Sequence, residues 1–235
     1  MSQPLLFSLI DKAIYDYNLI SDNDRLLIAA SSGKDSTSLV EYFANRARRP
    51  DCNFTFKAVH IETEITKPLN ENLQKLFLTW NVEAENIKVD VISRLKPRRK
   101  MNCFWCSTQR RTELINYALS NNFNKIVLGH HMDDILETLL MNMLEKAQLS
   151  TMPPFLQYEK YPVAIIRPLC YVQEKIIIEH AEKAGYISET CTCSFQENSM
   201  RKNARTKLEE LTEGSSIKKT HLFNSLKNIF PDYLP

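Results

Sequence analysis

Short apolar runs alternate along most of the chain with longer stretches in which apolar residues recur every three or four positions. The short runs have the length of buried strands and predict strands at residues 25–30, 54–61, 87–92, 125–129 and 163–167. The longer stretches predict helices at residues 5–19, 36–48, 69–81, 108–120, 134–146 and 173–184. Strands and helices that alternate at these lengths form βαβ units, so we expect an α/β fold with a parallel sheet flanked by helices. In such a fold the ligand site lies at the carboxyl ends of the strands.

The pattern changes at both ends of this alternating region. Residues 1–21 are amphipathic, with charged residues inside the apolar pattern, which predicts a docked N-terminal helix and not a cleavable signal. Residues 22–185 hold the alternating pattern and predict the main α/β domain. Residues 186–235 begin with Ser, Thr and Cys and continue with charged helical residues, so we expect a cysteine loop followed by a small C-terminal helical appendage.

Composition adds a location and a class of partner. No apolar run is long enough to span a bilayer, so we expect a soluble cytoplasmic protein with no membrane partner. Six cysteines in that reducing compartment favour metal binding or catalysis over disulfides. The net charge is only +2, but basic residues gather in two places, which indicates either an RNA footprint or a solvated surface. The denser set is Arg94, Lys96, Arg98, Arg99 and Lys100, and the looser set is Lys202, Arg205, Lys207, Lys218 and Lys219.

The first candidate site is the segment SSGKDS at residues 31–36, which links a predicted strand to a predicted helix. Such a loop offers backbone N–H groups, hydroxyls and a helix N-terminus to an anion, which suits the phosphates of a nucleotide. It differs from a Walker A loop, because no glycine stands five residues before Gly33 and Lys34 is followed by Asp35. The alternative is an ordinary strand-to-helix turn capped by Asp35 or Ser36.

A second candidate, LGHHMDD at residues 128–134, also follows a strand and opens a helix, so it should lie in the same cleft. Its two adjacent carboxylates, Asp133 and Asp134, are oxygen ligands of the kind that Mg²⁺ prefers beside a triphosphate. The alternative is that both aspartates cap the helix and complement its dipole, and that His130 is a core histidine. Capping and chemistry are compatible.

The third candidate is the pair Cys103 and Cys106, with Cys191 and Cys193 far downstream. A lone C-x-x-C is compatible with a redox pair, a zinc site or an iron–sulfur cluster. Four thiolates could close a structural zinc site, and three could hold a [4Fe–4S] cluster with one open iron. The other two cysteines of the chain lie in apolar contexts typical of small core residues.

These motifs, taken together and in order, resemble those of the TtcA/TtuA group of PP-loop tRNA thiolases. They are most similar to the TtcA branch, which makes 2-thiocytidine in tRNA anticodon loops. The resemblance covers residues 22–201, and the first motif has Ser32 where the group has a glycine. The motifs are residues 31–36, Cys103-x-x-Cys106 with Arg110 and Arg111, residues 128–134, Met152-Pro153-Pro154, Arg167-Pro168-Leu169 with Glu174, and Gln196-x-Asn198-x-x-Arg201 after a cysteine.

The resemblance implies a HUP-like fold of the adenine nucleotide alpha hydrolase type. It also implies ATP, Mg²⁺ and a [4Fe–4S] cluster as cofactors, and tRNA and a sulfur donor (sulfide or persulfide from a cysteine desulfurase) as partners; a homodimer is compatible with it. The implied ATP-binding residues are Ser31, Ser32, Gly33, Lys34, Asp35, Ser36, His60, Ile61, Gly129 and His130. The implied catalytic residues are Asp35, Asp133, Asp134, Arg110 and Arg111. The implied cluster ligands are Cys103, Cys106 and Cys191, with Cys193 as the alternative third ligand.

The implied reaction adenylates the C2 oxygen of a cytidine, which makes that oxygen part of a good leaving group, and then replaces it with sulfur. Mg²⁺ and backbone donors would stabilise the pyrophosphate, and Arg110 and Arg111 would neutralise charge on the α-phosphate. The basic run at residues 94–100 would guide the RNA, and Trp105 is a candidate for stacking on a base. Two other classes stay open. One is the same adenylation on another substrate, for tRNA uridine thiolation or C–N bond formation, and the other is a non-enzymatic ATP- or RNA-binding module with structural zinc.

Overall fold

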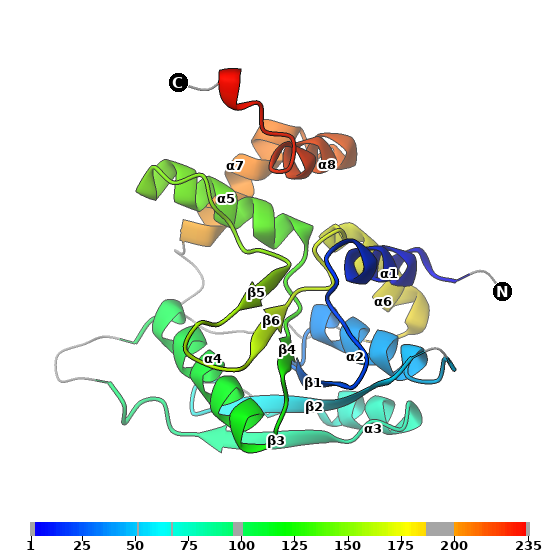
Figure 1. The fold of residues 1–235 in the computed structure, drawn as a ribbon. Helices are drawn as coiled ribbons and strands as arrows, with labels where there is room; N and C mark the ends of the chain where they lie inside the picture. Colours follow the sequence, from blue (N-terminus) through cyan, green and yellow to red (C-terminus); the bar gives the residue numbers. More distant parts are fainter. Residues whose placement is uncertain (1–2, 51, 67, 96–100, 187–199, 234–235) are drawn as a thin grey trace.

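The computed structural model describes residues 3–50, 52–66, 68–95, 101–186 and 200–233, and in this part of the chain six strands form one sheet (Figure 1). The strands are β1 (Asp24–Ala29), β2 (Phe54–Thr63), β3 (Ala84–Val89), β4 (Lys125–Val127), β5 (Phe155–Gln157) and β6 (Ala164–Ile166). Their order is β3-β2-β1-β4-β6-β5, and every neighbouring pair is parallel except β5 with β6. The predicted α/β fold around a mostly parallel sheet is confirmed.

Helices cover both faces of the sheet, because successive residues of a buried strand point to opposite sides. Leu26 and Ile28 of β1 belong to one core, and Leu27 between them belongs to the other. The described helices are α1 (Leu5–Asp16), α2 (Lys34–Arg46), α3 (Glu71–Thr79), α4 (Cys103–Ser120), α5 (Met132–Lys146), α6 (Glu174–Ala184), α7 (Met200–Thr212) and α8 (Ser216–Ser225), followed by a 3₁₀ turn at Pro231–Tyr233. Helix α4 packs on the core that contains Leu27, and α1, α2 and α5 pack on the other. None of the described helices combines the length and the apolar composition that a membrane span requires.

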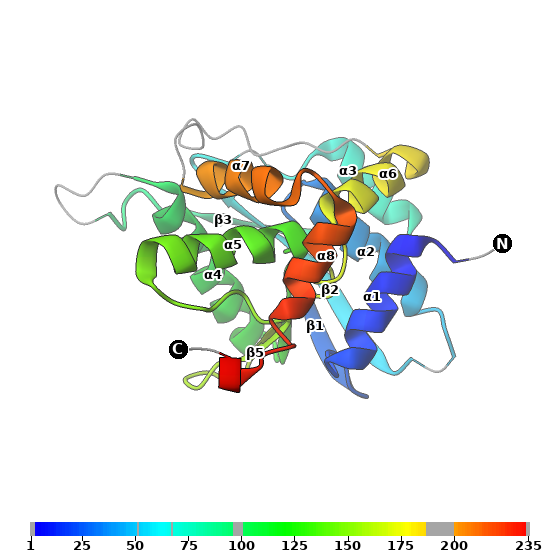
Figure 2. The ribbon, with the colours of Figure 1, turned by 90° about the horizontal axis from the view of Figure 1, so that it is seen from above.

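The C-terminal helices α7 and α8 pack beside α5, as Figures 1 and 2 both show. Ala204 and Leu208 of α7 and Phe223 of α8 are buried, and Leu208 and Phe223 belong to the core that α5 also enters. The predicted helical appendage therefore forms part of the packed domain, and it brings α7 next to the first turns of α5.

Two strands differ from the sequence expectation. Strand β3 spans residues 84–89 and not 87–92, because an edge strand tolerates polar residues such as Glu85, which pairs with Lys57 of β2. Strand β5 escapes prediction, because three residues that follow Pro153 and Pro154 are too few to show a period of two.

A buried ion pair joins the amino ends of β1 and β4. Lys125 Nζ lies 2.6 Å from Asp24 Oδ2 and 3.0 Å from the carbonyl oxygen of Leu19. Replacing Lys125 with alanine leaves the Asp24 carboxylate buried without its cation, so we expect the free energy of unfolding to fall by about 3 kcal/mol. Urea denaturation measures this change. Lys88→Ala, which breaks an exposed pair with Glu62, is the control and should cost less than about 1 kcal/mol; an equal loss in both variants would contradict the prediction.

Candidate nucleotide and cluster site

The carboxyl end of β1 leads into the loop at residues 31–36, and α2 begins inside this loop at Lys34. The hydroxyl of Ser36 holds the loop in shape, because its Oγ accepts a hydrogen bond from Ser31 N at 2.9 Å and donates one to Gly33 O at 3.1 Å. Ser32 has a left-handed backbone with φ of 63°, a conformation that glycine adopts freely and serine adopts under constraint. The loop therefore presents the N-terminus of α2, which attracts anions, to a ligand.

Several buried polar atoms around this loop lack a hydrogen bond within the described residues. They are Ser32 Oγ, Thr37 Oγ1 and Asp35 Oδ1, and the last of these forms an ion pair with Lys34 Nζ at 3.2 Å. Buried polar groups normally have partners, so unsatisfied atoms at a helix N-terminus indicate a place for a polar ligand. Burial also raises the pKa of Asp35, so a cation bound beside it would stabilise its charged form. Hydroxyl donors and a carboxylate at one helix start fit a triphosphate with its Mg²⁺ ion.

Gly129, which follows β4, brings the second predicted motif against this loop. A Cβ atom at Gly129 would lie 3.3 Å from Asp35 Cβ and 3.3 Å from Ser36 N. Any other residue there would therefore push on the loop. The structure thus brings the two motifs into direct contact, as their positions after neighbouring strands predict.

His60 and Ile61 lie in β2, on the other side of β1 from Gly129, and both are buried. His60 Nδ1 lies 2.6 Å from the carbonyl oxygen of Ala30, at the start of the loop. A carbonyl oxygen can only accept, so Nδ1 carries the proton of this hydrogen bond. His60 thereby supports the loop, and its predicted place at the border of adenine stays a prediction.

His130 contacts Arg167 beside the second motif. Its Nδ1 accepts a hydrogen bond from Arg167 Nε at 3.4 Å. Burial, assisted by the positive charges of Arg167, Arg201 and Arg111, lowers the pKa of His130 to about 3, although Asp134 acts in the opposite direction. The ring is therefore neutral at physiological pH, as an acceptor at Nδ1 requires.

The low pKa of His130 predicts a loss of stability on acidification. In the unfolded chain this histidine is protonated near its ordinary pKa of about 6.5, whereas in the folded protein it stays neutral. The unfolded state therefore binds more protons, and lowering the pH stabilises it relative to the folded state. Between about pH 7 and about pH 5, the free energy of unfolding from urea titrations should decrease less in His130→Gln than in the wild type. His221→Gln, on the exposed side of α8, should keep the wild-type decrease. An unchanged decrease in His130→Gln would contradict this account.

The two aspartates of the second motif have different surroundings, and Asp133 is fully engaged. Its Oδ2 accepts a hydrogen bond from Glu174 N at 2.7 Å, and its Oδ1 accepts one from Lys219 Nζ at 2.9 Å. Lys219 is in turn paired with Glu209 of α7. Asp133 therefore ties the start of α5 to α6 and α8, which is a positioning role.

Asp134 keeps one oxygen more open. Its Oδ2 accepts a hydrogen bond from His131 N at 3.1 Å within the capping box of α5, whereas its Oδ1 has Arg201 Nη1 as an ion-pair partner at 3.6 Å. Burial pushes the pKa of Asp134 up, but His131, His130 and Arg201 lower it below its ordinary value, so the group is ionised at neutral pH. An ionised, incompletely paired carboxylate next to the loop suits a cation ligand.

Two residues near this carboxylate have no role in the sequence prediction, His131 inside the second motif and Glu137 after it. His131 is the N-cap of α5, and its Nδ1 accepts a hydrogen bond from Asp134 N at 3.4 Å. Glu137, one turn after Asp134, is 0% exposed and accepts a hydrogen bond from Arg205 Nε at 2.6 Å. The sequence does offer one indication for Glu137, because it is an acid among the apolar residues of a predicted helix. Its neighbour Leu136 is a core residue, and acids are rarely buried in such surroundings without a partner.

The first two predicted cluster ligands stand at the start of α4. This helix begins at Cys103 and not at residue 108, because the side chain of Asn102 caps it by accepting a hydrogen bond from Trp105 N at 2.8 Å. Cys103 and Cys106 are therefore one turn apart along the backbone at the N-terminal end of this helix. Cys106 is buried. This placement fits a pair of thiolate ligands.

Other predicted residues lie outside the described part of the chain. Cys191 and Cys193 fall within residues 187–199, and most of the dense basic set falls within residues 96–100. Its described member, Arg94, forms an ion pair with Glu113 at 2.6 Å. The described residues contain no group of three or more His, Cys, Asp or Glu side chains arranged to hold a metal ion. The third cluster ligand therefore stays a prediction.

The arginines and aromatic residues of α4 differ in exposure. Arg110 is half-buried, and Arg111 is exposed but lies close enough to the second motif to lower the pKa values of both His130 and Arg167, the latter to about 10 with burial as the main cause. Trp105 is half-buried, whereas Phe104 is 81% exposed. Phe104 is thus the aromatic ring of this turn that is more available to a partner.

The chain resembles known proteins both in sequence and in fold. The sequence family described as a PP-loop domain matches residues 8–208. The chain is 34% identical over 229 residues to the tRNA-cytidine(32) 2-sulfurtransferase of Tolumonas auensis, which covers 96% of this chain and 76% of that protein. It is 32% identical over 233 residues to tRNA-cytidine(32) 2-sulfurtransferase 1 of Francisella philomiragia, which covers 96% of this chain and 90% of that protein. The fold matches the U34-tRNA thiolase NcsA from Methanococcus maripaludis with its [4Fe-4S] cluster, with a TM-score of 0.78 and 17% identity over 98% of this chain and 80% of that chain.

Proposed function

The chain belongs to the PP-loop family and, within it, to the group of tRNA-cytidine(32) 2-sulfurtransferases, and on this premise we propose that it thiolates cytidine 32 of tRNA in an ATP-dependent reaction. The observation that carries the proposal is the loop at residues 31–36, which contains buried unsatisfied polar atoms, packs against Gly129 and lies near the ionised Asp134. The names of the relatives supply the cytidine and the sulfur transfer.

The first half-reaction forms an adenylated cytidine. The C2 oxygen of the base attacks the α-phosphorus of ATP, the bond from that phosphorus to the bridging oxygen breaks, and pyrophosphate leaves. The N-terminus of α2 and the hydroxyls of the loop would hold the pyrophosphate, and Asp35 and Asp134 would hold Mg²⁺, which would neutralise phosphate charge. Arg111, whose charge acts on His130 of the second motif, and Arg110 beside it in the sequence would neutralise charge on the α-phosphate.

The second half-reaction exchanges the activated oxygen for sulfur. Sulfur at the oxidation level of sulfide attacks C2, and AMP leaves with the original oxygen, so no net electron transfer occurs. Cys103, Cys106 and Cys191, or Cys193 in its place, are the proposed ligands of a [4Fe–4S] cluster, which would carry sulfur from the donor to the activated base. The sulfur donor, Mg²⁺ and the homodimer stay predictions.

Mass spectrometry of tRNA nucleosides tests the substrate. We expect a deletion strain to lose 2-thiocytidine and to regain it when the wild-type chain, but not the Ser36→Ala chain, is supplied. Intact 2-thiocytidine in the deletion strain would overturn the proposal. A loss of 2-thiouridine in its place would reassign the acceptor base to uridine.

Anaerobic purification separates the proposal from the two other classes. A cluster predicts a brown protein that contains iron and releases AMP and pyrophosphate when tRNA is added. A binding module with structural zinc predicts a colourless protein that releases no AMP. An enzyme that forms C–N bonds predicts that Cys106→Ser leaves the activity intact, which would contradict the proposed sulfur transfer.

A further inference from the structure

Two acids of α5 face two arginines of α7 across the interface between these helices. Asp134 and Glu137 are one turn apart on α5, and Arg201 and Arg205 are one turn apart on α7. The ion pairs link Arg201 to both acids and Arg205 to Glu137. Because these first turns of α5 follow Gly129 directly, α7 brings its arginines to the edge of the proposed nucleotide site.

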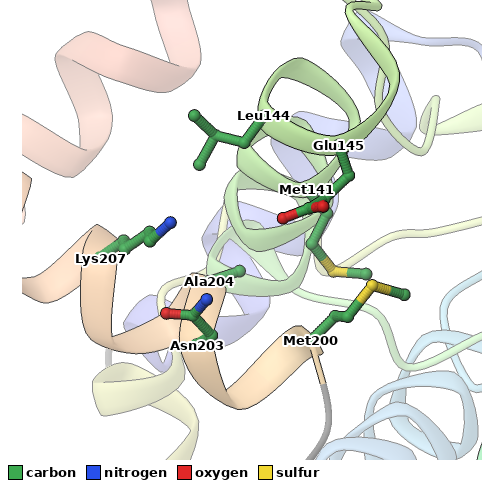
Figure 3. A pocket seen from close by; sticks show the side chains of 7 residues that line it. All are labelled: Met141, Leu144, Glu145, Met200, Asn203, Ala204 and Lys207. Carbon is green, nitrogen blue, oxygen red and sulfur yellow. The ribbon is translucent and has the colours of Figure 1, made fainter.

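The apolar side chains of α7 hold this helix in place independently of its arginines. Ala204 and Leu208 are buried, and further along the same interface the side chains of Met141 and Met200 point toward each other in a shallow pocket (Figure 3). Helix α7 therefore does not need Arg201 in order to dock on α5.

The two arginines are engaged very differently. Arg205 Nε donates to Glu137 Oε1 at 2.6 Å, and Arg205 Nη2 lies 3.7 Å from Glu174, which in turn pairs with Lys34 at 2.8 Å. The nearest acidic oxygens to Arg201 are both at 3.6 Å, one on Asp134 and one on Glu137, and no hydrogen bond of Arg201 is found within the described residues. Both side chains are about half exposed, so the contacts, and not burial, distinguish them.

Several acids gather where the triphosphate is proposed to bind. The acids Asp35, Asp134, Glu137 and Glu174 surround the start of α2 and α5, and Lys34 and Arg205 are already hydrogen-bonded to two of them. Unlike Lys34 and Arg205, Arg201 forms no hydrogen bond with the acids that it faces within the described residues, and the planar guanidinium group matches phosphate oxygens well. We propose that Arg201 is a nucleotide-binding residue that contacts the phosphates of ATP, whereas Arg205 is a positioning residue that anchors α7. This inference rests on the proposed function, because it assumes that ATP binds at the loop.

Calorimetric binding of a non-hydrolysable ATP analogue and of adenosine tests this role. A charge-assisted contact with phosphate predicts that Arg201→Gln binds the analogue about 10- to 100-fold more weakly than the wild type, with an unchanged affinity for adenosine. Arg201→Lys keeps the charge and loses the planar guanidinium group, so its affinity for the analogue should lie between those of the wild type and Arg201→Gln. This variant also tests the role if Arg201→Gln does not fold. Lys207→Gln, which removes the same charge from an exposed position of α7, is the matched control and should bind as the wild type does.

The outcomes separate this inference from the proposed function. Wild-type affinity of Arg201→Gln for the analogue would overturn the inference, and so would an equal weakening in Lys207→Gln, since the effect would then be general electrostatics. A loss of tRNA binding with unchanged analogue binding would reassign Arg201 to the RNA and overturn it as well. A wild-type protein that binds no nucleotide at all would overturn the proposed function itself, and the inference with it.

Discussion

Replacing Asp134 with asparagine should lower ATP-dependent thiolation of tRNA by about 100-fold or more, while the same replacement at Asp133 should mainly lower stability. Asparagine keeps the acceptor oxygen that caps α5 but removes the charge that would hold Mg²⁺. A metal ion contributes several kcal/mol to charge stabilisation in the transition state, and each 1.4 kcal/mol is about a factor of ten in rate. Pyrophosphate release and 2-thiocytidine formation measure the effect at saturating ATP.

The adjacent position is the matched control. Asp133→Asn keeps the shape of the side chain but leaves Lys219 with one carboxylate partner in place of two, so we expect the free energy of unfolding to drop by about 1–3 kcal/mol. Under conditions in which Asp133→Asn is folded, it should retain most of the wild-type thiolation activity. Full activity in Asp134→Asn, or a complete loss of activity in folded Asp133→Asn, would contradict the assignment of the cation to Asp134.

Replacing Cys106 with serine should remove the iron and reduce 2-thiocytidine formation to background. The serine is close in size to cysteine and occupies the same buried position in the first turn of α4, so the fold should persist. A cluster with three protein ligands does not tolerate the loss of one thiolate, because the remaining two leave two irons without protein ligands. Iron content, absorption and binding of the ATP analogue are the measurements, and the analogue should still bind.

Cys170→Ser is the matched control for this prediction. Burial raises the pKa of the Cys170 thiol to about 12, so it stays protonated and is a core residue and not a ligand. This variant should keep the iron and the activity. Of the downstream pair, Cys191→Ser is expected to behave as Cys106→Ser does, and Cys193→Ser as Cys170→Ser does. Iron that survives in Cys106→Ser, or zinc in the wild-type protein, would contradict the cluster.

The local signals of the chain predicted most of the fold and the contact between the first two motifs. The strand before residue 31 and the strand before residue 128 lie side by side as β1 and β4, and their loops meet at Gly129. This outcome was predictable, because parallel strands end at the same edge of the sheet. The start of α4 was not, because its cap is a single hydrogen bond from Trp105 N to Asn102, and the apolar periodicity becomes regular only after it.

The different contacts of the Asp133 and Asp134 carboxylates could not be predicted from the sequence. The two residues are adjacent and identical, and what distinguishes them is the set of side chains that tertiary packing brings to each. Lys219, which engages Asp133, is 86 residues away along the chain, and Arg205, which engages Glu137, is 68 residues away. No local pattern reports contacts over such separations.

By itself, then, the sequence determined the α/β class and predicted an anion-binding loop and a pair of cysteine ligands, because each depends on a periodicity or on residue types within a few positions. Only the tertiary structure decided that Asp134 is less completely paired than Asp133, and that Arg205 is hydrogen-bonded to an acid whereas Arg201 is not. Those properties follow from burial and from the charges that α6, α7 and α8 place around the start of α5, and packing, not sequence neighbourhood, sets them.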